Sequence, residues 1–330
     1  MKIVVDSMGG DQGVKEVVQG SIAAANELGV EIVLVGKKDI IEYELDKNNY
    51  HGNKIEILHA DEVIQNDESP SIAIRKKKNS SMVVGLNSLK EGVGDAFISA
   101  GNTGSLLAGG IFLVKRIEGI ERAAIVSLYP TKSGVSILLD AGANVDSKPE
   151  YLEQFAIMGS VYCEKVLGIA SPKVGLINVG TEKEKGNILV KEAYSLLESA
   201  NINFYGNIEA RDIPEGVVDV MVCDGFVGNI ILKLTEGLGQ SIFSALKEEI
   251  TKNFSSESST LFLKPEFEAF KQRFDYREYG GAPLLGLKKP VIKAHGSSDA
   301  LAFKNAIKQA KIMVEEDVID KIELDINIVK

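Results

Sequence analysis

The feature that most constrains the fold of this 330-residue chain is a repeated pattern, in which a short apolar run ends in a glycine-rich polar loop and then enters a helical pattern. The pattern occurs six times, with the loops MGGDQG (8–13), AGNTGS (100–105), DAGAN (140–144), NVGTE (178–182), CDGFVGN (223–229) and AHGSSD (294–299). A strand that opens into a helix presents unpaired backbone N–H groups and the positive end of the helix dipole at one place, which favours an anion. If the strands are parallel, all six loops lie on one edge of one sheet, and we expect an anion-binding crevice there.

Apolar runs and helical patterns alternate along the whole chain. Strands are predicted at 2–6, 31–36, 54–60, 95–100, 123–130, 135–142, 173–180, 203–207, 219–225 and 290–296. The runs at 123–130 and 135–142 are close enough to form a hairpin, and helical patterns follow most of the others. The alternation predicts a three-layer α/β/α fold with a mainly parallel sheet. We expect residues 1–330 to form one unit, in which two sub-lobes are allowed but no boundary is evident.

Composition narrows the class of protein. The net charge of −10 argues against nucleic-acid binding, which needs a basic face. The two cysteines, Cys163 and Cys223, have no spacing motif and indicate a reducing compartment. The start MKIVVDSMGG lacks the features of a signal peptide, and no apolar run approaches the roughly 18 residues of a membrane span. These observations predict an acidic cytoplasmic protein.

The least sheet-like region is 237–280. Its first part places Leu238, Ile242 and Leu246 on one helical face, and a second apolar run at 261–274 follows a serine-rich turn. This pattern predicts a helical hairpin that projects from the α/β body. Packing in the core or at a dimer interface is the favoured explanation of its apolar face, and docking of a membrane or an acyl chain is the alternative.

Several familiar kinds of site are missing from the sequence. No loop matches the dinucleotide fingerprint or the P-loop, and no serine lies in a G-x-S-x-G elbow. The three histidines, His51, His59 and His295, lack the spacing of zinc ligands, so we predict no metal site and no cofactor. Neither cysteine has the setting of a nucleophile. An enzyme with this sequence must therefore use a bound substrate as its nucleophile. The loop side chains available to hold that substrate, each of which taken alone is more often a turn or cap residue, are Asn102, Thr103, Asn144, Thr181 and Asn229.

His295 allows two interpretations. It lies between a predicted strand and Gly-Ser-Ser-Asp at a helix start. In the first interpretation this is an ordinary helix N-terminus, in which Ser297 or Ser298 caps the first turn. In the second, His295 binds a ligand or transfers a proton at the edge where α/β sheets bind ligands. The residues alone leave both open.

Ten segments of the chain carry a family resemblance. They are MGGD (8–11), HADEVI (59–64), RKKKNSSM (75–82), ISAGNTGSL (98–106), DAGANVDSKPE (140–150), AIMGSVY (156–162), GLINVGTEKEKGN (175–187), GNIEARD (206–212), DGFVGN (224–229) and YGGAPLLGLKKPVIKAHGSSD (279–299). Together they resemble the bacterial phosphate acyltransferases of phospholipid synthesis, the PlsX family, over almost the whole chain. One departure is visible: Gln12, Gly13 and Val14 stand where the family commonly has histidine, a small residue and proline. A role for a histidine at that point therefore cannot be transferred.

The resemblance implies a function and partners. Members transfer a fatty acyl group from acyl carrier protein to inorganic phosphate, and a membrane glycerol-3-phosphate acyltransferase then uses the acyl phosphate. The resemblance also implies a fold like that of isocitrate and isopropylmalate dehydrogenases, a homodimer, and a cytoplasmic enzyme that associates peripherally with the membrane surface. Phosphate is already a nucleophile and a thioester is already activated, so the enzyme has to position the two and stabilise an oxyanion.

On this basis roles can be assigned to individual residues. Phosphate is expected at the AGNTGS and HGSSD loops, with Lys293 or a lysine of 76–78 as its counter-charge. Asn229 and the amides of DGFVGN are the expected oxyanion donors, and His295 is the candidate that protonates the departing thiolate. The residues expected to bind phosphate or substrate are Gly101, Asn102, Thr103, Gly104, Asn144, Asn178, Gly180, Thr181, Asp224, Gly225, Gly228, Gly296, Ser297 and Ser298.

Acyl carrier protein is acidic, so its docking on an acidic enzyme needs a local basic patch. The candidates are Lys264, Lys271, Arg273, Arg277, Lys288 and Lys289, which cluster in sequence around the predicted hairpin and before His295. An ordinary solvated face is the alternative for any one of them. Three other functions remain to be separated by experiment: a phosphate acetyltransferase that uses coenzyme A, a decarboxylating dehydrogenase, and a scaffold without enzymatic activity.

Overall fold

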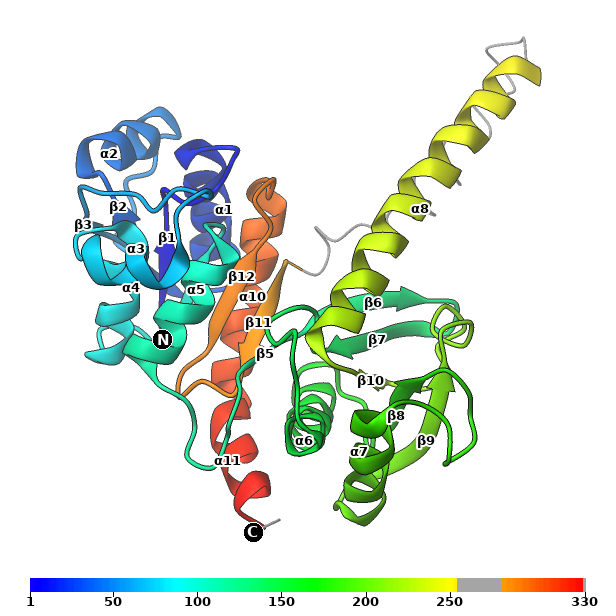
Figure 1. Ribbon diagram of the computed structural model, residues 1–330. Helices are drawn as coiled ribbons and strands as arrows, with labels where there is room; N and C mark the ends of the chain where they lie inside the picture. Colours follow the sequence, from blue (N-terminus) through cyan, green and yellow to red (C-terminus); the bar gives the residue numbers. More distant parts are fainter. Residues whose placement is uncertain (254–279, 329–330) are drawn as a thin grey trace.

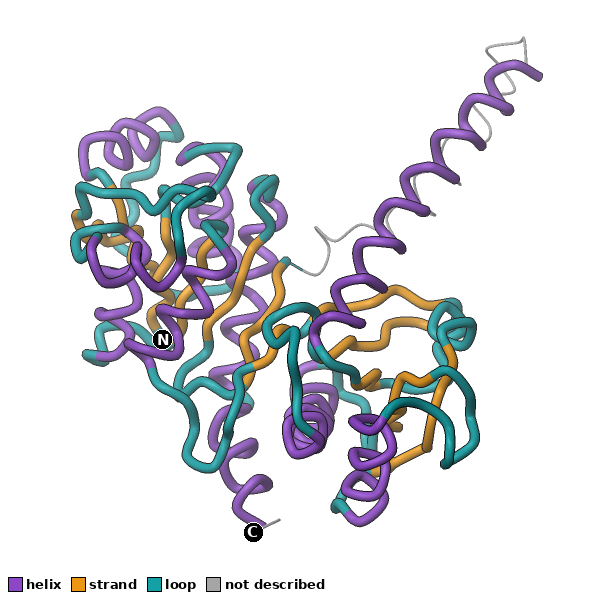
Figure 2. The backbone as a smooth tube through the Cα atoms, in the orientation of Figure 1, coloured by secondary structure: helices purple, strands orange, loops and turns teal. Residues whose placement is uncertain are grey.

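The computed structural model describes residues 1–253 and 280–328 (Figure 1). Within these residues the strands form two sheets, one of seven strands in the order β3-β2-β1-β4-β12-β11-β5 and one of five in the order β6-β7-β10-β8-β9. Helices cover both sheets, and Figure 2 shows the two sheets side by side with helices around them. The α/β class expected from the sequence is confirmed, whereas the expectation of a single sheet is wrong.

The seven-stranded sheet is the first sheet. Its strands are β1 (Lys2–Asp6), β2 (Glu31–Gly36), β3 (Ile55–His59), β4 (Ala96–Ser99), β5 (Ala124–Ile125), β11 (Gly281–Leu285) and β12 (Val291–Ala294). β3, β2, β1, β4 and β12 are parallel, and β11 pairs antiparallel with both β12 and β5. The two strands β5 and β11 are short and lie at one side of the sheet.

Both faces of the first sheet are covered, which explains why the central positions of β1 and β2 form continuous apolar runs. In β1, Ile3 and Val5 pack into one core cluster with α1 and α10, whereas Val4 packs into a second cluster with α4. The helices of this half are α1 (Val14–Glu27), α2 (Lys38–Lys47), α3 (Pro70–Lys76), α4 (Ser81–Lys90), α5 (Thr103–Gly109), the π-helical turn η1 (Gly110–Val114), α10 (Ala300–Glu315) and α11 (Val318–Ile328).

The five-stranded sheet is the second sheet. Its strands are β6 (Ser127–Thr131), β7 (Gly134–Leu139), β8 (Lys173–Asn178), β9 (Asn203–Glu209) and β10 (Val220–Val222). β7, β10, β8 and β9 are parallel, and β6 forms the predicted antiparallel hairpin with β7. One face packs on α6 (Pro149–Val166) and α7 (Ile188–Ser199), and the other packs on the first turns of α8 (Gly225–Asn253).

The two halves are joined by packing and by hydrogen bonds. One core cluster contains residues of both sheets together with α6, α10 and α11. Between β5 and β6, the Val126 N–H donates to the Pro283 oxygen at 2.9 Å. At the helix contact, the Gln309 amide of α10 donates to the Tyr162 hydroxyl of α6 at 2.6 Å. The two sheets are therefore held in a fixed relation to each other.

α8 is a single helix of 29 residues that leaves the body of the molecule (Figure 1). It starts at the end of β10 rather than at 237, so the predicted hairpin begins earlier than expected. Its exposed large apolar side chains recur every four residues, and these, which we name the α8 stripe, are Phe226, Ile230, Leu234, Leu238, Ile242 and Leu246. The described part of the chain does not cover the stripe. The expected second arm, up to 279, lies outside the described residues.

Candidate active site

Three of the six loops follow neighbouring parallel strands of the first sheet. MGGDQG follows β1, AGNTGS follows β4 and AHGSSD follows β12, and these strands are adjacent in the order β1-β4-β12. We name them the first-sheet loops. They touch: the Asp11 N–H donates to the Gly296 oxygen at 2.8 Å, and a Cβ on Gly9 would lie 2.7 Å from the Gly101 nitrogen. Glycine at position 9 thus allows two loops to approach closely.

Lys293 lies beneath these loops at the end of β12. Its ammonium donates to the backbone oxygens of Ala100, at 3.1 Å, and of Ala294. Burial lowers the pKa of Lys293 to about 8, while the charges of Asp11 and Asp6 act in the opposite direction. A lysine held in this way is a cation at neutral pH whose charge is sensitive to its surroundings. It is one of the two counter-charges that the sequence offered for phosphate; of the other, a lysine of 76–78, Lys77 is paired with Glu68 at 2.5 Å.

His295 follows Lys293 by two residues and is bonded within its own loop. Its Nδ1 accepts the Ser297 N–H at 3.2 Å and lies 2.7 Å from the Ser297 hydroxyl oxygen. Burial, with the nearby Lys293 charge, lowers the pKa of His295. The lowered pKa favours the neutral imidazole, and since Nδ1 accepts the Ser297 N–H, the hydrogen of that form lies on Nε2. In this form His295 can donate a hydrogen bond from Nε2.

The helix that follows His295 is capped by other residues than predicted. The Asp299 carboxylate accepts the Ala302 N–H at 3.0 Å, and the Glu16 carboxylate accepts the Ala300 N–H at 3.0 Å. Capping of α10 by Ser297 or Ser298 is thus wrong. Since two carboxylates already occupy the start of α10, the N–H groups of Ala300 and Ala302 are not available to an anion.

In the AGNTGS loop, the predicted residues have different surroundings. Asn102 caps α5, accepting the Ser105 N–H at 2.8 Å, and its amide donates to the Asn66 oxygen at 2.8 Å. Thr103 and Gly104 are exposed, whereas the buried Gly101 donates its N–H to the Ser99 hydroxyl at 3.1 Å. Asn66 was not predicted to take part, because it lies in a polar stretch that looked like an ordinary turn.

The other three loops follow neighbouring strands of the second sheet, in the order β7-β10-β8. We name DAGAN, CDGFVGN and NVGTE the second-sheet loops. DAGAN is organised by Asp140, which is fully buried and accepts the backbone N–H groups of Ile125, Gly142, Ala143 and Asn144 at 2.6–3.3 Å. The Asn144 amide adds a fifth bond at 3.0 Å. Asn144 is thereby committed to the loop itself.

CDGFVGN packs directly on DAGAN. The Gly225 N–H donates to the Asn144 oxygen at 2.8 Å, and a Cβ on Gly228 would collide with the Asp140 oxygen. Asp224 caps α8 by accepting the Val227 N–H at 2.9 Å. Asn229 is exposed, and its side chain lies against Gly142. Of the predicted residues here, Asn229 is the one whose side chain faces solvent beside both loops.

The polar side chain of Asn178 in the NVGTE loop forms hydrogen bonds within the turn that follows β8. The Asn178 side chain accepts the Val179 N–H at 2.8 Å and donates to the Lys185 oxygen at 3.1 Å. Gly180 is buried and Thr181 is exposed. A bond from the Asn207 amide to the Glu182 oxygen, at 3.0 Å, ties the loop to β9. These bonds place the loop with β9 rather than with DAGAN and CDGFVGN.

The two sets of loops approach each other through α8. The Glu236 charge raises the pKa of His295 and the Lys233 charge lowers it, so both α8 residues lie within electrostatic reach of that histidine. α8 itself begins in the CDGFVGN loop. A substrate between His295 and Asn229 would therefore contact loops of both sheets.

The predicted basic patch is divided in the structure. Lys264, Lys271, Arg273 and Arg277 lie outside the described residues. Lys288 and Lys289 are exposed in the turn between β11 and β12. Because β12 runs from this turn toward His295, the two lysines lie at the sheet edge opposite the first-sheet loops.

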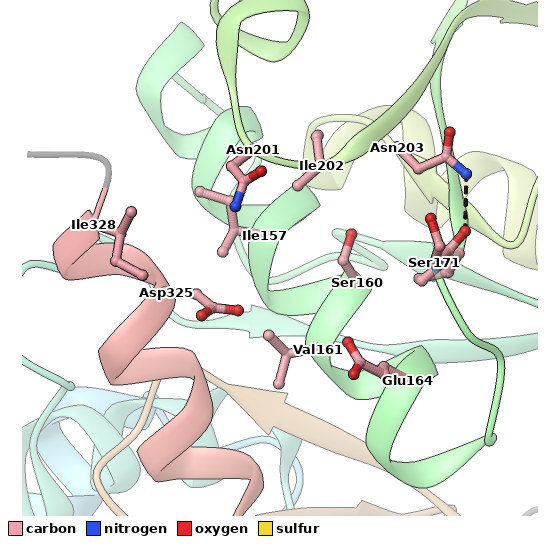
Figure 3. A pocket seen from close by; sticks show the side chains of 11 residues that line it. Ile157, Ser160, Val161, Glu164, Ser171, Asn201, Ile202, Asn203, Asp325 and Ile328 are labelled. Atoms are coloured by element: carbon pink, nitrogen blue, oxygen red, sulfur yellow. Dashed lines mark hydrogen bonds between the residues drawn. The ribbon is translucent and has the colours of Figure 1, made fainter.

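Other candidates lie away from the loops. A pocket of 490 Å³ lies between α6, α11 and the starts of β8 and β9, at the opposite edge of the second sheet from its loops (Figure 3). Cys163 and Cys223 are buried, and burial raises the pKa of both thiols, in agreement with their dismissal as nucleophiles. Across residues 1–253 and 280–328, no cluster of three or more metal-ligating side chains is present, and no helix is long and apolar enough to cross a membrane.

Comparison with known proteins identifies relatives over the full length. Residues 1–321 match the family described as fatty acid synthesis protein. A phosphate acyltransferase of Alkaliphilus oremlandii is 54% identical over 322 residues, which cover 98% of this chain and 96% of the relative. A phosphate acyltransferase of Clostridium botulinum (strain ATCC 19397 / Type A) is 55% identical over 324 residues, which cover 98% and 97%.

Solved structures with lower identity share the fold. A phosphotransacetylase from Streptococcus pyogenes superposes with a TM-score of 0.64 at 20% identity, covering 97% of this chain and 94% of that one. A 4-hydroxythreonine-4-phosphate dehydrogenase from Klebsiella pneumoniae has a TM-score of 0.54 at 15% identity, covering 95% and 99%. These likenesses confirm the α/β class, and the closer relatives confirm the resemblance seen in the sequence. The chain belongs to the phosphate acyltransferase family of fatty acid and phospholipid synthesis.

Proposed function

We propose that the protein transfers a fatty acyl group from acyl carrier protein to inorganic phosphate. A phosphate oxygen attacks the thioester carbonyl carbon, the carbon–sulfur bond breaks, and acyl phosphate and the free carrier thiol are formed. The observation that carries the proposal is the half-buried Lys293 ammonium, which bonds the Ala100 oxygen and lies within electrostatic reach of Asp11 and Asp6. A cation there compensates the phosphate charge, and the names of the relatives supply the reaction class.

Phosphate binding is assigned to the first-sheet loops. Lys293 supplies the charge, and the assigned donors are the exposed Thr103 and Gly104 in AGNTGS and the half-buried Gly296 and Ser297 in AHGSSD. Gly101 and Asn102 act indirectly, because they already use their polar groups within the protein. Positioning a nucleophile in this way accounts for a large part of the rate of a bimolecular reaction.

The carbonyl end of the thioester is assigned to the second-sheet loops. Asn229 is exposed beside Gly142 and can donate to the oxygen on which negative charge develops. His295, whose lowered pKa favours the neutral form, serves as a hydrogen-bond donor to phosphate or to the departing thiolate rather than as a charged acid. If kcat of His295→Ala equals that of the parent across neutral pH, His295 has no role in proton transfer.

We further propose a homodimeric, cytoplasmic enzyme that associates with the membrane surface, where a glycerol-3-phosphate acyltransferase consumes its product. The α8 stripe supports the dimer, because such a row of exposed apolar side chains favours a partner surface. Light scattering tests this: Leu238→Lys with Ile242→Lys should yield monomers, and an unchanged mass would exclude the stripe as the interface.

Docking of the acidic carrier protein remains assigned to Lys264, Lys271, Arg273 and Arg277, which follow α8 in sequence. Lys288 and Lys289 are less suitable. They lie one strand length, roughly 15 Å, from the first-sheet loops, at the opposite edge of the sheet. Lys271→Glu with Arg273→Glu should raise KM for the carrier substrate, whereas Lys288→Glu with Lys289→Glu should change it little.

The direct test of the reaction is an incubation of acyl carrier protein thioester with phosphate. We expect equal amounts of acyl phosphate and free thiol. Parallel reactions contain acetyl-CoA with phosphate, or a hydroxy acid with NAD(P), to detect the two alternative enzymes. If acyl phosphate forms only from acetyl-CoA, the protein is a coenzyme A-dependent enzyme and the proposal is wrong. If no product forms in any reaction, the scaffold without enzymatic activity is the remaining alternative.

A further inference from the structure

Asp6 was not singled out by the sequence, yet it lies under the first-sheet loops. It ends β1, between β2 and β4, and is 1% exposed. A buried carboxylate is costly unless its oxygens are bonded. Asp6 accepts the Met8 N–H at 3.0 Å, the Ser99 hydroxyl at 2.7 Å and a bond from the Ser81 side chain. Burial raises the pKa of Asp6, and these donors with Lys293 act against that rise.

Through these bonds one carboxylate reaches two loops. Met8 opens the MGGDQG loop, so its N–H fixes the direction in which that loop leaves β1. Ser99 connects Asp6 to the AGNTGS loop, since its hydroxyl donates to Asp6 and accepts the Gly101 N–H at 3.1 Å. The two connections lead to the place where Gly9 and Gly101 lie in close contact, and a Cβ on Gly9 would also lie 2.9 Å from an Asp6 carboxylate oxygen.

Asp6 interacts electrostatically with Lys293, which precedes the third loop, AHGSSD. Lys293 lies within electrostatic reach of Asp6, and that negative charge favours the ammonium form against the effect of burial. The other charged or titratable groups that face Lys293 are Asp11, from the MGGDQG loop, and His295, from its own loop. With a pKa of about 8, the charge of Lys293 at neutral pH depends on these neighbours.

We propose that Asp6 is a positioning residue for phosphate: its buried carboxylate holds two of the first-sheet loops in place and keeps the Lys293 ammonium charged. The inference rests on the proposed function, because it takes phosphate to bind beside Lys293. Asp140 is the natural comparison. It organises the DAGAN loop from a similar strand end, but its oxygens are satisfied by amide groups.

The test is the pH dependence of KM for inorganic phosphate. In Asp6→Asn, which keeps the size and loses the charge, Lys293 should lose its proton at lower pH. The alkaline rise of KM should then begin about one pH unit below that of the parent. At pH 8, KM should be about fivefold higher, with kcat within about threefold. Asp140→Asn should leave the pH at which KM rises unchanged.

Ser99→Ala separates geometry from charge. It removes the connection from Asp6 to Gly101 but keeps the carboxylate, so KM for phosphate should rise about threefold with no shift in pH. Circular dichroism checks that each variant is folded. If Asp6→Asn does not fold, Ser99→Ala decides: an unchanged KM overturns the inference.

The outcomes separate the inference from the proposed function. If the parent forms no acyl phosphate, the proposed function fails. If the parent is active and Asp6→Asn follows its pH profile, or if Ser99→Ala shifts the profile as far as Asp6→Asn does, the role of Asp6 is overturned while the function stands.

Discussion

The first-sheet loops and the second-sheet loops share a construction and differ in charge. Each set is organised by a buried aspartate at a strand end, Asp6 in one and Asp140 in the other. Asp6 lies beside the Lys293 ammonium, whereas Asp140 is surrounded by backbone N–H groups and the Asn144 amide. The same scaffold thus supports one set of loops with a lysine beneath it, suited to phosphate, and one set without a lysine or arginine in its loop segments, suited to an oxygen that gains charge only during the reaction.

The largest expected effect comes from removing the cation. Lys293→Met should lower kcat/KM for phosphate by about 100-fold or more, because the three first-sheet loops themselves contain no lysine or arginine that could replace the charge. Kinetics at varied phosphate concentration measure this. Lys132→Met, which removes an exposed lysine from the β6–β7 turn, is the control and should behave like the parent. If both variants had the same kinetics, Lys293 would not bind phosphate, and the proposed difference between the two sets of loops would be wrong.

The second prediction concerns the second-sheet loops. Asn229→Ala should lower kcat by about 10–100-fold and leave KM for phosphate within about threefold, because the lost donor acts on the carbonyl oxygen and not on phosphate. Saturation curves for both substrates separate the two parameters. A rise in phosphate KM without loss of kcat would place phosphate at the second-sheet loops instead.

The third prediction is a pH dependence confined to the first-sheet loops. Lys293 is protonated below its pKa of about 8 and attracts phosphate, and it loses that charge above it. KM for phosphate should therefore be low below pH 8 and rise up to tenfold per pH unit above. Phosphate also titrates, so Lys293→Arg is the comparison, because arginine stays charged. The same alkaline rise in Lys293→Arg would assign it to a group other than Lys293.

The smallest effects are expected at the helix caps. Asn102→Ala, at α5, and Asp224→Ala, at α8, should each lower the free energy of unfolding by about 1 kcal/mol. Urea denaturation measures both. Asn102 lies in the phosphate loop, so its variant should also raise KM for phosphate modestly, while Asp224→Ala should not. If Asp224→Ala raised KM for phosphate and Asn102→Ala did not, phosphate would be assigned to the second-sheet loops instead of the first-sheet loops.

Much of the fold follows from local pattern. The strands at 2–6 and 31–36 and the helix that starts at Pro149 match the structure, because buried parallel strands and first-turn prolines leave clear signals. The division into two sheets was missed, since pairing between distant strands has no local signal. The strand 281–285 was missed for the same reason, because one of its partners, β5, is distant in the chain.

The site was predicted less completely than the fold. Repetition of polar glycine loops predicted six turns that follow strands, and the structure contains all six, while the family resemblance drew attention to Lys293, Asn229 and His295. Sequence could not distinguish residues that face a substrate from those, such as Asn144 and Asn178, that bond their own loop. It also could not reveal Asp6, because its role depends on Ser99 and Lys293, which are distant in the chain.

The most direct test of the central claim is a crystal structure of the protein soaked with inorganic phosphate. We expect phosphate to bind at the first-sheet loops, within hydrogen-bond distance of the Lys293 Nζ. Phosphate bound at Asn229 and Gly142, with Lys293 making no contact, would contradict it.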